Sequence, residues 1–242
     1  MANAREIRIH TSILASIEKR CLIWMAHRMP RRVNSDHLTA LGAVALLAAG
    51  FCYAMAPAHS WALIAGVLLL AVNWFGDSLD GTLARVRRHE RPRYGFYVDH
   101  VLDALGMLFV IGGLALGGYM SLPIAAGFLV AYYLLNIEIA LATHTVGTFR
   151  ISYWKFGPTE MRILLAIGTL QLFRSVDVGI LGSRYLLFDV GGAVAIAALL
   201  LTFVTSSVIN ARLLYRTEPL PPATPDDKAA IRFSALKLGT RG

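Results

Sequence analysis

Long apolar runs separated by short polar segments dominate the chain. We identify six such runs, each close to the roughly 20 residues that an α-helix needs to cross about 30 Å of hydrocarbon. They cover residues 38–57, 60–79, 96–117, 121–143, 160–180 and 186–209. The fifth run is the weakest, because Arg162, Gln171 and Arg174 interrupt it. The pattern predicts an all-α, polytopic membrane protein with six transmembrane helices.

The segment before the first run has a different pattern. Residues 4–29 alternate basic and apolar side chains at helix-like spacing. This pattern predicts an amphipathic helix that lies in the membrane interface, or one that packs on the protein itself. We divide the chain into an interfacial segment (1–37), a six-helix transmembrane domain (38–212) and a proline-rich tail (213–242) that we expect to be flexible. The first 37 residues hold no uninterrupted apolar core, so we expect no cleavable signal peptide.

Composition and charge support a membrane location. Hydrophobic residues make up 56% of the chain and charged residues only 16%, which is far more apolar than a soluble domain. Arginines and lysines gather in the two terminal segments and in every other connection between the runs. The connections that alternate with these, at 57–60, 117–121 and 181–186, hold a single arginine or lysine, Arg184. The positive-inside rule therefore places both termini on the cytoplasmic side. This bias and anionic lipid headgroups account for the net charge of +8, so we expect no nucleic-acid partner.

Aspartates gather where the second and third runs approach the cytoplasmic side. Asp77 and Asp80 are three residues apart, and Asp99 and Asp103 are four apart, so each pair falls on one face of a helix. Charges inside a bilayer cost about 2.5–3.5 kcal/mol each on insertion scales, and crowded carboxylates repel one another. A bound Mg²⁺ or Mn²⁺ would offset both effects, because these ions prefer oxygen ligands. The alternative is a solvated loop in which the acids pair with Arg85, Arg87, Arg88, Arg91 and Arg93.

The segment from Asp77 to Asp103 resembles the signature of the CDP-alcohol phosphotransferases, also called CDP-alcohol phosphatidyltransferases. That signature is D-x2-D-G-x2-A-R-x8-G-x3-D-x3-D. Its fixed positions are filled here by Asp77, Asp80, Gly81, Ala84, Arg85, Gly95, Asp99 and Asp103. One departure is that nine residues, rather than eight, separate Arg85 from Gly95. The extra residue falls in the basic turn, where length is easily absorbed.

The resemblance implies a metal-dependent membrane enzyme of phospholipid synthesis. The cytidine diphosphate group would bind at Asp77, Asp80, Gly81, Ala84, Arg85 and Gly95. The metal, two Mg²⁺ or Mn²⁺ ions, would be held by Asp77, Asp80, Asp99 and Asp103. We expect Asp103 also to be the base that takes the proton of the acceptor alcohol. The resemblance further suggests a homodimer with its interface near the third and fourth spans.

A second polar set is suited to an acceptor that carries a phosphate. It comprises Arg150, Lys155, Glu160 and Arg162, with Arg212 added from the last helix. The alternative explanation is that these basic residues only flank the membrane spans on the cytoplasmic side, where arginine and lysine are enriched. Within the spans, Asn73 and Glu138 have two interpretations each: a role in the site, or a hydrogen bond to a neighbouring helix.

We predict transfer of a phosphatidyl group from CDP-diacylglycerol to a small soluble alcohol, with release of CMP. A polyol phosphate is one candidate for that alcohol. A second prediction reverses the roles, so that a CDP-choline- or CDP-ethanolamine-type donor reacts with diacylglycerol. A third, from another class of protein, is a small cation transporter whose aspartate cluster is the transit site.

Overall fold

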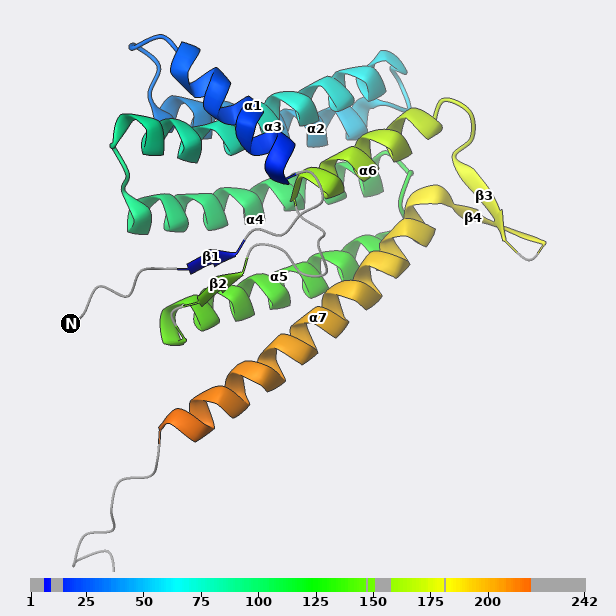
Figure 1. Ribbon diagram of the computed structural model, residues 1–242. Helices are drawn as coiled ribbons and strands as arrows, with labels where there is room; N and C mark the ends of the chain where they lie inside the picture. Colours follow the sequence, from blue (N-terminus) through cyan, green and yellow to red (C-terminus); the bar gives the residue numbers. More distant parts are fainter. Residues whose placement is uncertain (1–6, 10–14, 147, 151–157, 181, 219–242) are drawn as a thin grey trace, which may run out of the picture. The chain divides into compact units, whose positions relative to one another are not determined.

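The computed structural model describes residues 7–9, 15–146, 148–150, 158–180 and 182–218 (Figure 1). The helices are α1 (Ala15–Arg28), α2 (Ser35–Met55), α3 (Trp61–Arg87), α4 (Pro92–Leu116), α5 (Leu122–Thr145), α6 (Pro158–Gln171) and α7 (Leu187–Thr217). The short strands are β1 (Ile7–Ile9), β2 (Thr148–Arg150), β3 (Asp177–Ile180) and β4 (Ser183–Leu186). β1 pairs with β2 in parallel, and β3 pairs with β4 in an antiparallel hairpin. Apart from these two small sheets, the described chain is helical, as predicted.

Five helices in the described residues are long and apolar enough to cross a membrane: α2, α3, α4, α5 and α7. They correspond to five of the six predicted runs. The run at 160–180 differs, because α6 ends at Gln171 and β3 begins at Asp177. The intervening Ser175 hydroxyl donates to the Asp177 carbonyl oxygen at 2.6 Å, and such side-chain bonds to the backbone favour turns over helix. The structure therefore does not confirm a sixth transmembrane helix.

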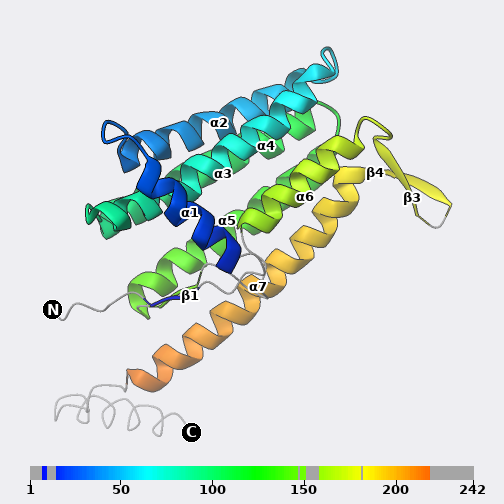
Figure 2. The same cartoon turned by 45° about the horizontal axis from the view of Figure 1, so that its top comes forward.

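Although short, α6 contacts both α3 and α2, and it is visibly shorter than α3 and α4 (Figure 2). Near its start, Arg162 forms an ion pair with Asp77 in the second half of α3. In its last turn, the Thr169 hydroxyl hydrogen-bonds the Tyr53 hydroxyl, near the end of α2, at 2.9 Å. With 14 residues, α6 rises about 21 Å. It lies among the spans without having the length of one.

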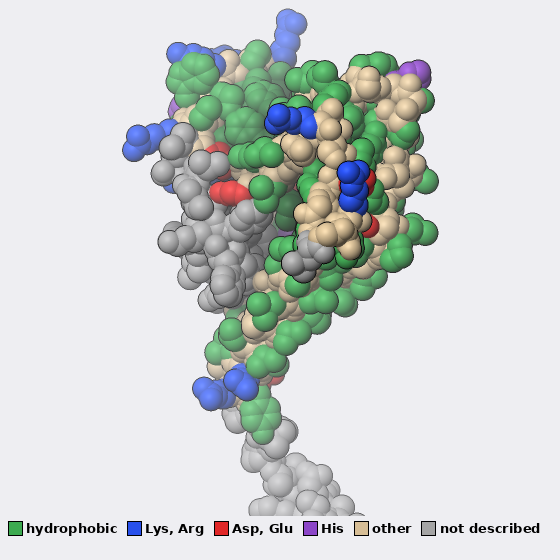
Figure 3. Space-filling model, turned by 90° about the vertical axis from the view of Figure 1, so that its right-hand side faces the viewer, with side chains coloured by type: hydrophobic (Ala, Val, Ile, Leu, Met, Phe, Trp, Pro, Cys, Tyr) green, Lys and Arg blue, Asp and Glu red, His purple; other side chains and the backbone are tan. Residues whose placement is uncertain are grey.

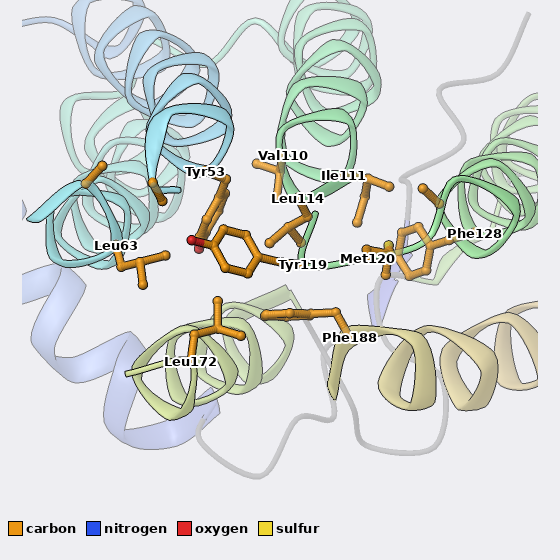
Figure 4. Close-up of a cluster of buried hydrophobic side chains, with 13 residues drawn as sticks. Tyr53, Leu63, Val110, Ile111, Leu114, Tyr119, Met120, Phe128, Leu172 and Phe188 are labelled. Carbon is orange, nitrogen blue, oxygen red and sulfur yellow. The ribbon is translucent and has the colours of Figure 1, made fainter. Parts of the chain in front are cut away.

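The main apolar core lies at the Tyr53 end, away from the aspartates (Figure 4). It joins side chains from α2, α3, α4, α5, α6 and α7 with the α4–α5 turn. Its buried members include Tyr53, Leu114, Tyr119, Phe128, Leu172 and Phe188. In the same region the backbone N–H of Ser121 donates to the Asp189 carboxylate at 2.7 Å. These contacts fix the far ends of the helices that carry the site.

Glycines bring α2 against both α3 and α4. A Cβ added to Gly76 would lie 2.6 Å from the carbonyl oxygen of Leu38 and 2.7 Å from the nitrogen of Gly42. A Cβ on Gly113 would lie 2.1 Å from the carbonyl oxygen of Gly50. Small residues allow helix backbones to approach this closely. The two crossings pack α3 and α4 against the same helix, α2.

Helix α1 lies across α3 (Figures 1 and 2). Leu22 and Ala26 are buried against Leu38, Leu79 and Leu83. Of the two interpretations of residues 4–29, packing on the protein is therefore observed for this helix. Contact of its exposed side with the membrane interface stays a prediction.

Residues 207–242 form a unit separate from residues 1–206 and are considered on their own. The described part of that unit, residues 207–218, is the last stretch of α7 and the residue after it. Arg212 is exposed there. Most of the tail predicted at 213–242 lies outside the described residues.

Candidate metal centre

Three of the predicted aspartates meet between α3 and α4. Oxygens of Asp77, Asp99 and Asp103 all lie within 4.8 Å of one another, and the three residues are partly buried. α2 packs on both helices through its glycines, so the two acidic faces are held opposite each other. The helical spacing read from the sequence therefore becomes a single cluster of carboxylates.

The fourth aspartate, Asp80, is oriented by the first turns of α2. Its Oδ2 accepts a hydrogen bond of 2.5 Å from the Thr39 hydroxyl, and its Oδ1 accepts one from the backbone N–H of Gly81. The Ser35 hydroxyl donates to the Asp80 carbonyl oxygen at 3.0 Å. Asp80 lines the same small cavity as the other three aspartates.

Arg162 of α6 completes the cluster with a positive charge. Its Nη2 lies 2.5 Å from Oδ2 of Asp77, and its Nε donates to the Asn73 side-chain oxygen at 2.8 Å. Asn73 in turn donates to the carbonyl oxygen of Gly42 at 2.9 Å, so its predicted bond to a neighbouring helix is confirmed. Only 15% of the Arg162 side chain is exposed. A buried guanidinium of this kind stays charged and requires its carboxylate partner.

The residues present suit a divalent cation. The four aspartates, with Thr39 and Asn73, line a cavity of about 20 Å³, which is room for one water-sized species. Mg²⁺ and Mn²⁺ favour carboxylate oxygens over nitrogen or sulfur ligands. Crowded carboxylates repel one another, and a bound divalent cation would offset that repulsion.

A larger hollow of about 380 Å³ lies between the start of α2 and the α3–α4 turn. Its lining includes Ser35, Ala84, Arg87, His89 and Arg91. Ser35 also bonds Asp80, so the hollow adjoins the aspartates through α2. Its volume lies within the range of small-molecule sites.

The remaining signature residues leave open space beside α3 and α4. A Cβ on Gly81 would meet only the Arg85 guanidinium, at 3.5 Å, and one on Gly95 would meet nothing within 4 Å. Arg85 is exposed, and its Nη2 donates to the Thr82 hydroxyl at 3.1 Å. Neither glycine is required by packing, in contrast to Gly76 and Gly113.

The predicted acceptor residues are only partly brought together. Arg162 joins the aspartates, and Glu160 lies in the first turn of α6 and is partly buried. Lys155 and the side chain of Arg150 lie outside the described residues. Arg212 belongs to the separate unit that begins at residue 207.

Several polar partners of the site were not predicted from the sequence. Thr39 and Ser35 bond Asp80, and Glu18 of α1 bonds Trp74, beside the cluster. Each partner is more than 40 positions away in the chain, so local periodicity carries no signal for it. Glu138, by contrast, accepts a bond of 2.8 Å from the buried Ser206 hydroxyl, which confirms its predicted helix-to-helix interpretation.

Comparisons with known proteins identify relatives of the chain. Residues 33–206 match the family described as CDP-alcohol phosphatidyltransferase. An archaetidylinositol phosphate synthase from Methanothermobacter thermautotrophicus is 35% identical over 109 residues, which are 43% of this chain and 53% of that protein. Another from Pyrococcus horikoshii is 28% identical over 153 residues, 61% of this chain and 74% of that protein. The match thus spans about half the length of the first relative and three quarters of the second.

Proposed function

The chain belongs to the CDP-alcohol phosphatidyltransferase family, and from this premise we propose that it transfers a phosphatidyl-type group from a CDP-linked lipid to a phosphorylated polyol. CMP is the leaving group. The observation that carries this proposal is the cluster of Asp77, Asp99 and Asp103 within 4.8 Å, with buried Arg162 bonded to one of them. Carboxylates would serve the metal and the proton transfer, and a guanidinium is suited to phosphate.

The donor would bind along the cytoplasmic part of α3 and the start of α2. The hollow beside Ala84 has the volume for a nucleotide-sized group. Gly81 and Gly95 leave the helix surfaces accessible next to it, and Arg85 is placed to pair with phosphate. Lipid chains would stay among the apolar spans, which suits a donor with a water-soluble head and a membrane-bound tail.

Asp77, Asp80, Asp99 and Asp103 would hold Mg²⁺ or Mn²⁺, with two ions expected from the family resemblance. When bound, the cation would neutralise diphosphate oxygens and stabilise the leaving CMP. Asp77 is bonded to Arg162 and Asp80 to Thr39. Asp103 lies in the same cluster as Asp77 and Asp99, where it would take the proton of the acceptor hydroxyl.

Two observations support an acceptor that carries a phosphate: the position of Arg162 and the names of the relatives. Both relatives are named for archaetidylinositol phosphate, a product name that contains a polyol phosphate. Arg162 donates through Nε to Asn73 and through Nη2 to Asp77, and a guanidinium has five N–H donors, so it could also donate to a phosphate. Glu160, Arg150, Lys155 and Arg212 stay predictions for the same acceptor site. A homodimer near α4 and α5, and a cytoplasmic site with both termini on that side, also stay part of the proposal.

The test is CMP release by the purified full-length chain in detergent with Mg²⁺ and CDP-diacylglycerol. The acceptors are inositol phosphate, inositol, glycerol phosphate, serine and ethanolamine. We expect release with inositol phosphate and a loss of about 10²- to 10⁴-fold in Asp103→Asn, the usual contribution of a base. Chelation of Mg²⁺ should abolish the reaction.

The outcomes separate the candidates. Release with a non-phosphorylated acceptor alone would overturn the polyol phosphate. Release only when CDP-choline or CDP-ethanolamine is supplied with diacylglycerol would reverse the roles of donor and acceptor. Asp103→Asn with wild-type turnover would remove Asp103 as the base.

A further inference from the structure

A carboxylate from α1 joins α3 to α6 beside the aspartate cluster. Oε1 of Glu18 accepts from the Trp74 indole N–H at 2.9 Å and from the Thr159 hydroxyl at 2.8 Å. The Ser78 hydroxyl lies 3.4 Å from the same oxygen. Glu18 is partly buried, and an ionised carboxylate can accept several such bonds at once. One side chain of α1 thus contacts two helices of the site.

The positions of these donors relate Glu18 to Arg162. Trp74 and Ser78 lie four residues apart on one face of α3, and Asp77 stands between them in the chain. Thr159 precedes Arg162 by one helical turn in α6. Two neighbouring turns of contact therefore connect α6 to α3. Arg162 contacts α3 directly, and Thr159 contacts it through Glu18.

We infer that Glu18 is a positioning residue that holds the first turn of α6 against α3 and thereby keeps Arg162 at Asp77 and Asn73. Glu18 itself does not belong to the aspartate cavity. Its effect on catalysis would pass through Arg162, so this inference rests on the proposed role of Arg162 in binding the acceptor phosphate.

The attachment of α1 to the rest of the protein depends on its apolar packing and not on Glu18. Leu22 and Ala26 are buried against Leu38, Leu79 and Leu83, and Glu18 is not part of this apolar cluster. Removal of the Glu18 carboxylate should therefore leave α1 in place but release the Thr159 hydroxyl. The donor site, built from α2, α3 and α4, should be unaffected.

The experiment compares Glu18→Ala, Glu18→Gln and Lys19→Ala in the full-length chain, with CDP-diacylglycerol and inositol phosphate as substrates. We expect Glu18→Ala to raise the KM for inositol phosphate about tenfold, as for loss of hydrogen bonds to a charged group, with kcat and the KM for CDP-diacylglycerol within twofold. Glu18→Gln retains an accepting oxygen and should recover most of the loss. Lys19 is exposed on the same helix, so Lys19→Ala should match the wild type.

The double variant of Glu18→Ala and Thr159→Val tests whether Glu18 acts through Thr159. Thr159→Val should give the same shift as Glu18→Ala, and the combination should be no worse than either alone, because both remove one link. Additive losses would overturn the inference, as would equal rises in both KM values or a Gln variant no better than Ala.

Hydrogen exchange supplies a readout that does not depend on turnover. The amides of residues 159–163 should exchange faster in Glu18→Ala than in Lys19→Ala, since the first turn of α6 has lost a tie. Unchanged exchange would overturn the positioning role even in an active enzyme. If the wild type shows no transfer to inositol phosphate, the proposed acceptor fails, and the exchange result still decides whether Glu18 positions α6.

Discussion

Hydrogen bonds from neighbouring helices hold two carboxylates of the site, Asp77 and Asp80. Arg162 fixes one oxygen of Asp77, and the Thr39 hydroxyl fixes one oxygen of Asp80. These partners come from α6 and α2, whereas the acids they contact belong to α3. Losing a partner that orients a metal-ligating side chain typically costs about 10- to 100-fold in metal affinity or activity.

Thr39→Val removes the donor to Asp80 and keeps the shape of the side chain. If Asp80 ligates the cation, the Mg²⁺ concentration for half-maximal CMP release should rise about 10- to 100-fold, the usual cost of losing such a partner. Magnesium titration of the purified variant measures this shift.

Two controls define the result. Thr39→Ser retains the hydroxyl and should stay near the wild type. Thr145→Val removes a hydroxyl that donates to the Leu141 carbonyl oxygen within its own helix, and should leave the titration unchanged. A normal magnesium requirement in Thr39→Val would separate Asp80 from metal binding.

At the scale of elements, the closeness of α2 to its neighbours depends on positions that lack a side chain. Gly50 and Gly113 bring α2 and α4 together, and Gly42 and Gly76 bring α2 and α3 together. The site depends on both crossings, because its aspartates come from α3 and α4. Packing in a membrane gains little from the hydrophobic effect and relies on such close contact.

Gly113→Ala should therefore destabilise the fold, with Gly112→Ala as its matched control. A Cβ at position 113 would lie 2.1 Å from the Gly50 carbonyl oxygen, whereas one at position 112 would meet nothing within 4 Å. Overpacking of this kind costs about 1–3 kcal/mol. Thermal unfolding in detergent should show a lower Tm for Gly113→Ala only. Equal Tm values for the two variants would contradict the close crossing of α2 and α4.

The elements also show where sequence patterns succeed and fail. The runs at 38–57, 60–79, 96–117, 121–143 and 186–209 are continuous, and each becomes a long helix. The run at 160–180 is interrupted near its end by Arg174 and Asp177, and the helix stops at Gln171. Hydropathy averaged over 20 residues cannot distinguish one long helix from a short helix followed by a turn and a strand, because both contain the same apolar residues.

The same distinction applies to the site. Asp77, Asp99 and Asp103 could be predicted as a group because helical spacing and the family signature are both local in sequence. Arg162 entered only as an acceptor candidate, although it pairs with Asp77 from 85 positions away. Glu18 lies 141 positions from Thr159. Such contacts depend on how helices pack, which the spacing of apolar residues along one helix does not specify.

At the scale of the whole molecule, the outer surface matches a membrane environment. On the face shown in Figure 3, apolar side chains cover most of the described surface and charged side chains are few. Leu116, Leu122 and Val194 are 82%, 74% and 68% exposed, which would be costly in water. The chain is an integral membrane protein, and its orientation can be tested directly.

We predict that the α3–α4 turn faces the cytoplasm and the β3–β4 hairpin faces the opposite side, since basic residues concentrate at the former. In a chain with Cys21 and Cys52 replaced by serine, Ser183→Cys should react with a membrane-impermeant maleimide on intact cells. His89→Cys should react only after permeabilisation; both positions are exposed. Labelling in the reverse pattern would invert the orientation and place the aspartate cluster on the other face.

The Gly42–Gly76 crossing limits how the site can open. At this crossing the two backbones are in direct contact, so a change of side-chain rotamer cannot alter the distance between the helices. We therefore expect α2 and the middle of α3, next to Asp77, to behave as one rigid unit. By contrast, α6 contacts α3 through a long side chain, because Arg162 bonds Asp77 and Asn73. The Arg162 side chain can change rotamer. We therefore expect any helix movement that admits a substrate to involve α6, with Asp77 of α3 keeping its place against α2.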